Sequence, residues 1–590
     1  MKLKKILPVM GSLLAGGVLL AAYRKSKLAT NPTDTPERVA KTTKQMVTEA
    51  DVANAQQLLL DPNNWHYNAQ NKVYYQVGIK YGTKTSSRIY ESMGIFIPEK
   101  YMTVTQHDQK TYSLAVNPQA ALAGYTARTA PIVMRVKTPR YAAQAAPTDY
   151  DGQSAKYTDA GFVYVAAGCR GLDSADHANG AAPWGITDLK AAVRTLRLNQ
   201  ASLAGDTDRI FTFGHSGGGA QSALMGATGD SQAYIKYLKA IGAPLATMAK
   251  TPTSDAIAGA MVWCPITSLD TANEAYEWNM GQYSSVGTRK PGTWTKALST
   301  DMAASYAQYI NRLGLKDSQG QPLELKRSAT GIDMAGTYAA YLKQEVEQSL
   351  NIFLQETRFP YETSSDQNPK IGAPNGPVTH QTYQTVQEYI DALNGNDEWI
   401  RYDAQKNRAT ITSLAAFVKH CKPAVKAVGA FDGLTRQQTE NQLFATSGCQ
   451  ANHFDATIGH LLKQHQATYS QFAHYQASYA SAYRADLQKT DAQGSSIQTR
   501  LNMYNPMYYL TSYYAGHNTS KVAKYWRIRT GINQPDTALP VETNLALALK
   551  QNSQVKSVDF ATVWGQGHIR AERQGNHETN FIEWINRSLK

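Results

Sequence analysis

Gly214-His215-Ser216-Gly217-Gly218 is the segment of this chain whose residue types and spacing indicate chemistry most directly. This G-x-S-x-G pattern follows a short apolar run at residues 209–213 and precedes a helix-like segment at residues 220–226. A serine hydroxyl is a poor nucleophile unless a tight strand-to-helix turn exposes its Oγ and a base can reach it. The pattern therefore predicts that Ser216 is a nucleophile on such a turn.

The residues before the turn supply the context that the bare pattern lacks. G-x-S-x-G occurs by chance in about one chain of this length in five, because glycine is common. Here Leu189, Val193 and Leu196 recur at the spacing of an amphipathic helix, and residues 205–208 break the chain before the apolar run. The order helix, strand, turn, helix is that of an α/β-hydrolase.

Two residues near the end of the chain complete a candidate triad with Ser216. Asp536 lies in the loop after a predicted strand at 525–529, and His568 lies in a glycine-rich loop after a predicted strand at 558–563. Loops that follow the carboxyl ends of parallel strands gather at one edge of a sheet, so the three side chains are expected to converge. Their order in the chain is that of α/β-hydrolases and not of chymotrypsin or subtilisin.

Backbone N–H groups are expected to stabilise the oxyanion that forms when a serine attacks a carbonyl group. The first is that of Gly217, directly after the nucleophile. The second is expected in residues 138–141, after a predicted strand at 132–136, although this loop lacks paired glycines. Such acyl transfer needs neither a metal nor an organic cofactor.

The first residues of the chain predict export. A basic cap at residues 2–5 precedes an almost wholly apolar stretch at 6–23, and residues 24–27 are again mostly basic. Residues 1–27 are therefore predicted to be a signal peptide or an N-terminal anchor, and both alternatives stay open. We expect a secreted or cell-surface protein, with membrane or cell-wall association through the N-terminus if the segment is retained.

Charge and cysteine content exclude several classes of function. The net charge is +13, but lysines and arginines are scattered without interleaved aromatic residues, so a nucleic-acid partner is not expected. The four cysteines have no C-x-x-C spacing, which argues against a zinc or redox centre. They allow three full disulfide pairings, and buried free thiols account for them equally well: Cys169, Cys264, Cys421 and Cys449.

The 590 residues suit an α/β-hydrolase core with a large insertion. We predict a linker at 28–60, the first part of the core at 61–276, and its second part at 501–590. Residues 277–500 show no core strand and are predicted to form an inserted lid domain. The predicted fold class is thus α/β, with a mostly parallel sheet flanked by helices.

Several separate motifs resemble those of one family, the bacterial tannases (tannin acyl hydrolases), which are related to feruloyl esterases. The resemblance covers roughly residues 160–590. Besides the serine turn and the acid and histidine loops, it rests on Gly168-Cys169-Arg170-Gly171, residues 182–197 with Asp188 to Arg194 at their centre, Cys264-Pro265-Ile266-Thr267, Ala275-Tyr276-Glu277-Trp278, Lys426 to Asp432, Glu440-Asn441 and Tyr504-Asn505-Pro506-Met507.

This resemblance implies that Ser216 is the nucleophile, His568 the base and Asp536 the acid. It also implies that Lys426, Glu440 and an aspartate of the acid loop hold the phenolic hydroxyls of a galloyl group. Family members tend to have two aspartates in that loop, two positions apart, whereas this chain has Gln534 and Asp536. Asp536 is assigned to the triad, with a second role in substrate binding, and Gln534 is expected to hydrogen-bond a phenol.

These observations predict a secreted serine esterase that hydrolyses galloyl esters and gallotannins through an acyl-enzyme and releases gallic acid. Its partners would be small galloyl esters and polyphenols. Two alternatives stay open. The chain is a feruloyl or general carboxylesterase if Lys426 and Glu440 do not face the acyl ring. It is a non-catalytic polyphenol- or cell-wall-binding surface protein if the hydrolase scaffold has lost its activity.

Overall fold

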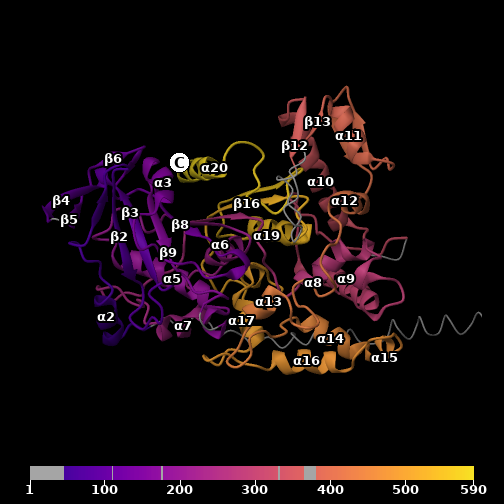
Figure 1. Cartoon of the computed structure of the whole chain (residues 1–590), viewed down its shortest axis with the longest axis horizontal. Coiled ribbons are helices and arrows are strands. Elements are labelled where there is room, and N and C mark those ends of the chain that lie inside the picture. The colour runs from indigo at the N-terminus through magenta and orange to yellow at the C-terminus, as the bar shows by residue number, and fades with distance from the viewer. Residues whose placement is uncertain (1–45, 109, 175–176, 330–332, 365–379) are drawn as a thin grey trace, which may run out of the picture. The chain divides into compact units, whose positions relative to one another are not determined.

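The computed structural model describes residues 46–590 except 109, 175–176, 330–332 and 365–379 (Figure 1). The predicted signal peptide or anchor therefore lies outside the described residues. The end of the predicted linker is helical: α2 (Glu49–Gln56) begins with a capping box at Thr48, and Asn54 donates to the carbonyl of Gly242 (2.9 Å). The folded part thus begins before residue 61.

A nine-stranded, mostly parallel sheet forms the centre of the fold. Counted from one edge of the sheet, the first three strand pairings are antiparallel, and all the following pairings are parallel. The predicted strands at 132–136, 209–213, 525–529 and 558–563 all belong to it. In spatial order the strands are β1 (His66–Asn68), β2 (Val73–Lys80), β3 (Ser92–Pro98), β9 (Val163–Ala167), β8 (Ile132–Val136), β10 (Ile210–His215), β11 (Gly259–Trp263), β16 (Tyr525–Gly531) and β17 (Ser557–Val563).

Helices cover both faces of this sheet because its strands are apolar on both sides. In β10, Ile210 packs into the core beneath one layer of helices, and Phe211 and Phe213 pack into the core beneath the other. The first layer includes α5 (Trp184–Leu198), α6 (Gly217–Ala227), α7 (Ile235–Ala240) and α19 (Leu539–Gln551), and the second includes α3 (Ala155–Asp159) and α20 (His577–Leu589) (Figure 1). The α/β-hydrolase architecture is confirmed.

Smaller elements surround the first part of the core. The short helix α4 (His177–Gly180) precedes α5. Two hairpins pair outside the large sheet: β4 (Met102–His107) with β5 (Tyr112–Val116), and β6 (Ala121–Leu122) with β7 (Tyr125–Thr126).

A long insertion separates β11 from β16. Among its described residues no strand joins the large sheet, and its two hairpins are β12 (Tyr361–Ser364) with β13 (His380–Tyr383) and β14 (Ile400–Asp403) with β15 (Arg408–Ile411). The described residues all belong to one compact unit. The helices of the insertion are α8 (Ala272–Asn279), α9 (Trp294–Leu313), α10 (Thr337–Glu356), α11 (Val386–Asn394), α12 (Leu414–Cys421), α13 (Thr439–Leu443), α14 (Ala456–Gln464), α15 (Gln466–Tyr469), α16 (Ser478–Leu487), α17 (Ile497–Met503) and α18 (Pro506–Leu510).

The described residues bear on the cysteines and on membrane-spanning helices. All four cysteines are free thiols, so none of the three disulfide pairings is formed. No helix within the described part of the chain is long and apolar enough to cross a membrane.

A buried ion-pair network fixes α5 against the segment before β11. Asp255 accepts from Lys190 Nζ (2.7 Å) and from Arg194 Nε (2.7 Å), and all three side chains are almost fully buried. The two cations hold the pKa of the Asp255 carboxyl below its ordinary value in spite of its burial. Removing this carboxylate charge would leave two buried cations without their partner.

We therefore expect Asp255→Asn to lower the free energy of unfolding by about 3 kcal/mol or more, because breaking a buried ion pair leaves an uncompensated charge. Urea denaturation followed by circular dichroism measures this. Asp208→Asn is the matched control, because that side chain is 83 % exposed and its ion pair with Arg197 is at the surface. Equal, small effects of both substitutions would contradict the stabilising role of the buried network.

Candidate active site

Ser216 occupies the sharp turn between β10 and α6 that the sequence predicts. Its backbone has φ 59° and ψ −124°, a left-handed conformation that non-glycine residues rarely adopt. The neighbouring glycines allow the close approach of chain segments: a Cβ on Gly214 would lie 2.3 Å from the carbonyl oxygen of Gly218, and one on Gly218 would lie 2.3 Å from that of Val136. The turn is thus strained in the way expected of a nucleophile elbow.

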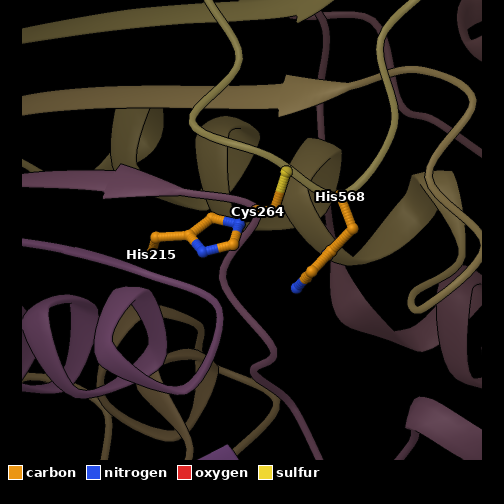
Figure 2. Close-up of side chains that lie close together, drawn as sticks. All are labelled: His215, Cys264 and His568. Carbon is orange, nitrogen blue, oxygen red and sulfur yellow. The ribbon is translucent and has the colours of Figure 1, made fainter. Parts of the chain in front are cut away.

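His568 lies in the loop after β17 and meets the acid loop there. Its Nδ1 is 3.2 Å from Asp536 Oδ2 and 3.1 Å from Gln534 Oε1, and its side chain is only 8 % exposed. Its ring centroid is 4.8 Å from that of His215, the residue before Ser216 (Figure 2). The structure therefore brings together the three loops that the sequence predicts to converge.

Gln534 is expected to hydrogen-bond a phenol, but in the structure its amide is buried against other residues of the protein. Its side chain is 1 % exposed, and both ends of its amide already have protein partners. Oε1 faces His568, while Nε2 donates to Thr537 and to Glu542 Oε1 (2.9 Å). Gln534 thus helps to orient His568, but a neutral amide cannot stabilise an imidazolium as the Asp536 carboxylate can.

Lys422 and Glu542 support the acid loop from behind, and sequence reasoning missed both. The buried Lys422 ammonium donates to the backbone carbonyl of Gln534, and the buried Glu542 also accepts from Thr537 Oγ1 (2.7 Å). Burial lowers the pKa of Lys422 and raises that of Glu542. In the sequence Glu542 looks like an ordinary acidic residue in the first turn of a helix, so nothing there signals its role.

Lys426 reaches the site from a loop of the insertion. Its Nζ lies 3.8 Å from Asp536 Oδ1 and 4.0 Å from the centre of the Phe431 ring. Its backbone is held at both ends of the residue: its amide donates to Tyr276 Oη (3.0 Å), and its carbonyl oxygen accepts from Arg289 (2.8 Å). The predicted lysine is therefore fixed beside the acid loop.

Glu440 lies in the first turn of α13 and is 7 % exposed. Burial raises its pKa, Asp536 adds to this effect, and the positive charges of Lys426 and Arg140 oppose it. Its neighbour Asn441 fixes the segment by donating to Asp432 Oδ1 (2.6 Å). Lys426, Glu440 and Asp536 therefore interact electrostatically although they come from three separate segments.

The predicted oxyanion loop lies directly against Gly217, the first residue of α6. A Cβ on Gly217 would lie 2.4 Å from the carbonyl oxygen of Thr138 and 3.3 Å from the amide nitrogen of Arg140. Arg140 (φ 53°) and Tyr141 (φ 59°) both adopt the left-handed conformation. The loop thus makes without paired glycines the tight turn for which glycines would be expected.

Comparisons with known proteins agree with this fold. The family model BD-FAE, a feruloyl esterase-like α/β-hydrolase family, matches residues 125–288. The tannin acyl hydrolase from Lactobacillus plantarum is 25% identical with a TM-score of 0.64, covering 90% of this chain and 99% of that chain. The Fusobacterium nucleatum tannase is 26% identical with a TM-score of 0.64, again covering 90% and 99%. A comparison with curated proteins finds no match.

One further solved structure is a tannin acyl hydrolase in complex with ethyl gallate, 25% identical with a TM-score of 0.64, covering 91% of this chain and 100% of that chain. These matches confirm the resemblance to bacterial tannases and the prediction of a carboxylic ester hydrolase. The roles of individual site residues stay predictions.

We expect Asp536→Asn to lower kcat for ester hydrolysis by about 10⁴-fold, because an amide cannot stabilise the imidazolium. Gln534→Met, which removes only a neutral acceptor, should cost about tenfold. Hydrolysis of a chromogenic acetate ester measures both, and thermal unfolding checks that each variant is folded. If Gln534→Met lowers kcat as much as Asp536→Asn does, the special role of the Asp536 carboxylate in supporting His568 is contradicted.

The pH dependence should follow the pKa of His568, which burial and the charges of Lys426 and Lys422 lower, while Asp536 opposes them. A base must be deprotonated, so a lowered pKa keeps the enzyme active at lower pH. The midpoint of the acidic limb of kcat/KM is expected below pH about 6.5, the ordinary pKa of histidine. An acidic limb above pH 6.5 would show that Asp536 raises the pKa of His568 more than burial and the two lysines lower it.

Lys426→Met should move this limb to higher pH, because removing a nearby positive charge stabilises the imidazolium. Lys250→Met, on an exposed lysine, is the matched control and should leave the limb in place. The comparison separates a local electrostatic effect from a change in net charge.

Proposed function

We propose that this protein is a serine esterase of the tannase type, which hydrolyses galloyl ester bonds of simple gallate esters and gallotannins and releases gallic acid. The observation that supports this most is the convergence of Lys426 and Glu440 on Asp536, which itself contacts His568. Hydrogen-bonding groups for a phenolic ring therefore stand beside the reacting groups of an esterase.

In the first step Ser216 Oγ attacks the ester carbonyl and His568 Nε2 takes its proton. Asp536 holds the Nδ1 proton and stabilises the imidazolium. His568 then gives the proton to the leaving alcohol as the acyl-enzyme forms. In the second step water, deprotonated by the same histidine, releases the acid and restores Ser216.

The oxyanion receives two backbone donors in this proposal. The N–H of Gly217, at the N-terminus of α6, is the first, because the first amides of a helix have no intrahelical partner. The second is that of Arg140. The amide nitrogens of Tyr141 and Arg140 both lie close to Gly217, but the amide of Tyr141 already donates to the carbonyl of Thr138 (3.0 Å).

A galloyl ring carries three adjacent hydroxyls, and the site offers matching chemistry. Carboxylates accept hydrogen bonds from phenols, and an ammonium donates to a phenolic oxygen. Glu440 and Asp536 supply the carboxylates, and Lys426 the ammonium. Glu440 and Asp536 are buried and Lys426 is partly buried, so these groups reject a ring without hydroxyls, because they would then lose their partners. The ethyl gallate that the similar tannin acyl hydrolase binds has the same ring.

We further propose that the protein acts outside the cell, as a secreted or cell-surface enzyme. Support comes from the sequence alone: a basic cap, an apolar stretch and a second basic cluster in residues 1–27. An enzyme outside the cell would reach galloyl esters of polyphenols without their import into the cell.

The decisive experiment measures gallic acid release from methyl gallate, with methyl ferulate and methyl benzoate in parallel. Wild type should hydrolyse methyl gallate, and Ser216→Ala should abolish this. Methyl benzoate should be hydrolysed about 10⁴-fold less efficiently, because it leaves the buried polar groups unpaired. Glu440→Gln should lower kcat/KM for methyl gallate by about 30-fold or more, the cost of replacing a charged acceptor.

Glu398→Gln is the matched control for Glu440→Gln, because the side chain of Glu398 is 74 % exposed. Equal turnover of ferulate and gallate, unaffected by Glu440→Gln, would assign the protein to the general esterases. A rate retained in Ser216→Ala would exclude the serine mechanism. Binding of polyphenol without turnover of any ester would favour the non-catalytic alternative.

A further inference from the structure

Three side chains that could ligate a metal ion lie together behind the nucleophile elbow. His215 ends β10, Cys264 directly follows β11, and His568 lies in the loop after β17. One ligand atom from each lies within 4.8 Å of the others. Figure 2 shows the ring of His215 and the thiol of Cys264 beside the ring of His568. The parallel sheet brings these three strand ends together.

Both imidazoles have a ring nitrogen available at this point. Within the described residues, neither His215 Nε2 nor His568 Nε2 has a hydrogen-bond partner, and both atoms are buried. The Nδ1 of His568 faces Asp536 and Gln534, so its proton lies on that side and the lone pair on Nε2. The buried Nε2 of His215 can therefore be offered to a metal ion.

The thiol of Cys264 completes the set. It is fully buried and lies 3.3 Å from the carbonyl oxygen of Ile569, to which it donates. Two imidazoles and one thiol suit Zn²⁺, which takes nitrogen and sulfur ligands in a tetrahedral arrangement and can keep water as its fourth ligand.

We propose that His215, Cys264 and His568 form an inhibitory site for Zn²⁺ or a similar thiophilic divalent cation. On binding, two metal–nitrogen bonds and one metal–sulfur bond form, the S–H bond of Cys264 breaks, and its proton leaves to solvent. No electron is transferred. Ligand atoms of a tetrahedral zinc site lie about 3.5 Å apart, so the side chains close by about 1 Å.

The inhibitory consequence rests on the proposed function, because His568 Nε2 is the atom that accepts the proton of Ser216. A metal on that atom removes the base. Neighbouring positive charges, those of Lys422, Lys426 and Arg570, oppose binding, as do the protonated forms of the histidines, and Asp536 favours it. These opposing charges weaken binding, so a chelator is expected to restore activity.

The test titrates ZnCl₂ into the full chain during hydrolysis of methyl gallate. Wild type should lose activity and regain it with EDTA. Cys264→Ala should keep the rate without metal and need at least tenfold more Zn²⁺ for the same inhibition. Because the ring of His215 packs on that of His568, His215→Gln is compared with its own rate without metal, and it should also need at least tenfold more Zn²⁺ to lose the same fraction of that rate. Cys421→Ala, which removes a thiol elsewhere, is the matched control. Unchanged sensitivity in both site variants would overturn the proposal.

A readout without catalysis uses Co²⁺ as the probe. Wild type should show the charge-transfer absorption of a cobalt–thiolate bond, and Cys264→Ala should not. Absence of this band in wild type would overturn the site, whatever the esterase activity. If wild type shows the band but hydrolyses no ester, the proposed function fails and the site stands. Thermal unfolding checks each variant, and Cys264→Ser replaces Cys264→Ala if the latter does not fold.

Discussion

The carboxylate of Asp536 is the group on which the rest of the site depends. One of its oxygens is 3.2 Å from His568 Nδ1, and the other is 3.8 Å from Lys426 Nζ. The same charge therefore orients the histidine and helps to hold the lysine. This arrangement follows from the residue at position 534: with glutamine there, no second carboxylate of the acid loop shares these tasks, and Asp536 interacts with both halves of the site.

The surroundings of Asp536 are built to keep this carboxylate in place. Gln534, two residues earlier, is fixed by Glu542 and by the Lys422 ammonium, both buried. A lysine and a glutamate are costly to bury. The network of Lys422, Gln534 and Glu542 is stable because hydrogen bonds satisfy most of the polar atoms of these two charged side chains. Because these charges are buried, any group that enters the site must replace their hydrogen-bond partners, or a buried charge is left unpaired.

Much of the core could be predicted because it depends on local patterns. The amphipathic spacing of Leu189, Val193 and Leu196 matches a helix in which all three side chains are buried. The glycines around Ser216 signal a close approach of chain segments that only glycine permits. The sequence places residues 138–141 in a loop after β8, but it does not predict the conformation of this loop, because positive φ at Arg140 and Tyr141 has no local signature.

The sequence by itself determined the order of the elements, the nucleophile elbow and the positions of the acid and histidine loops, because periodicity, glycine and chain order are local properties. Only the tertiary structure decided that the amide of Gln534 faces His568, that Lys422 and Glu542 lie behind it, and that Cys264 meets two histidines. Apart from the contact of Glu542 with Gln534, which spans eight positions, these contacts join residues tens to hundreds of positions apart. Their existence depends on burial and on side-chain direction, which the fold sets and no local pattern encodes.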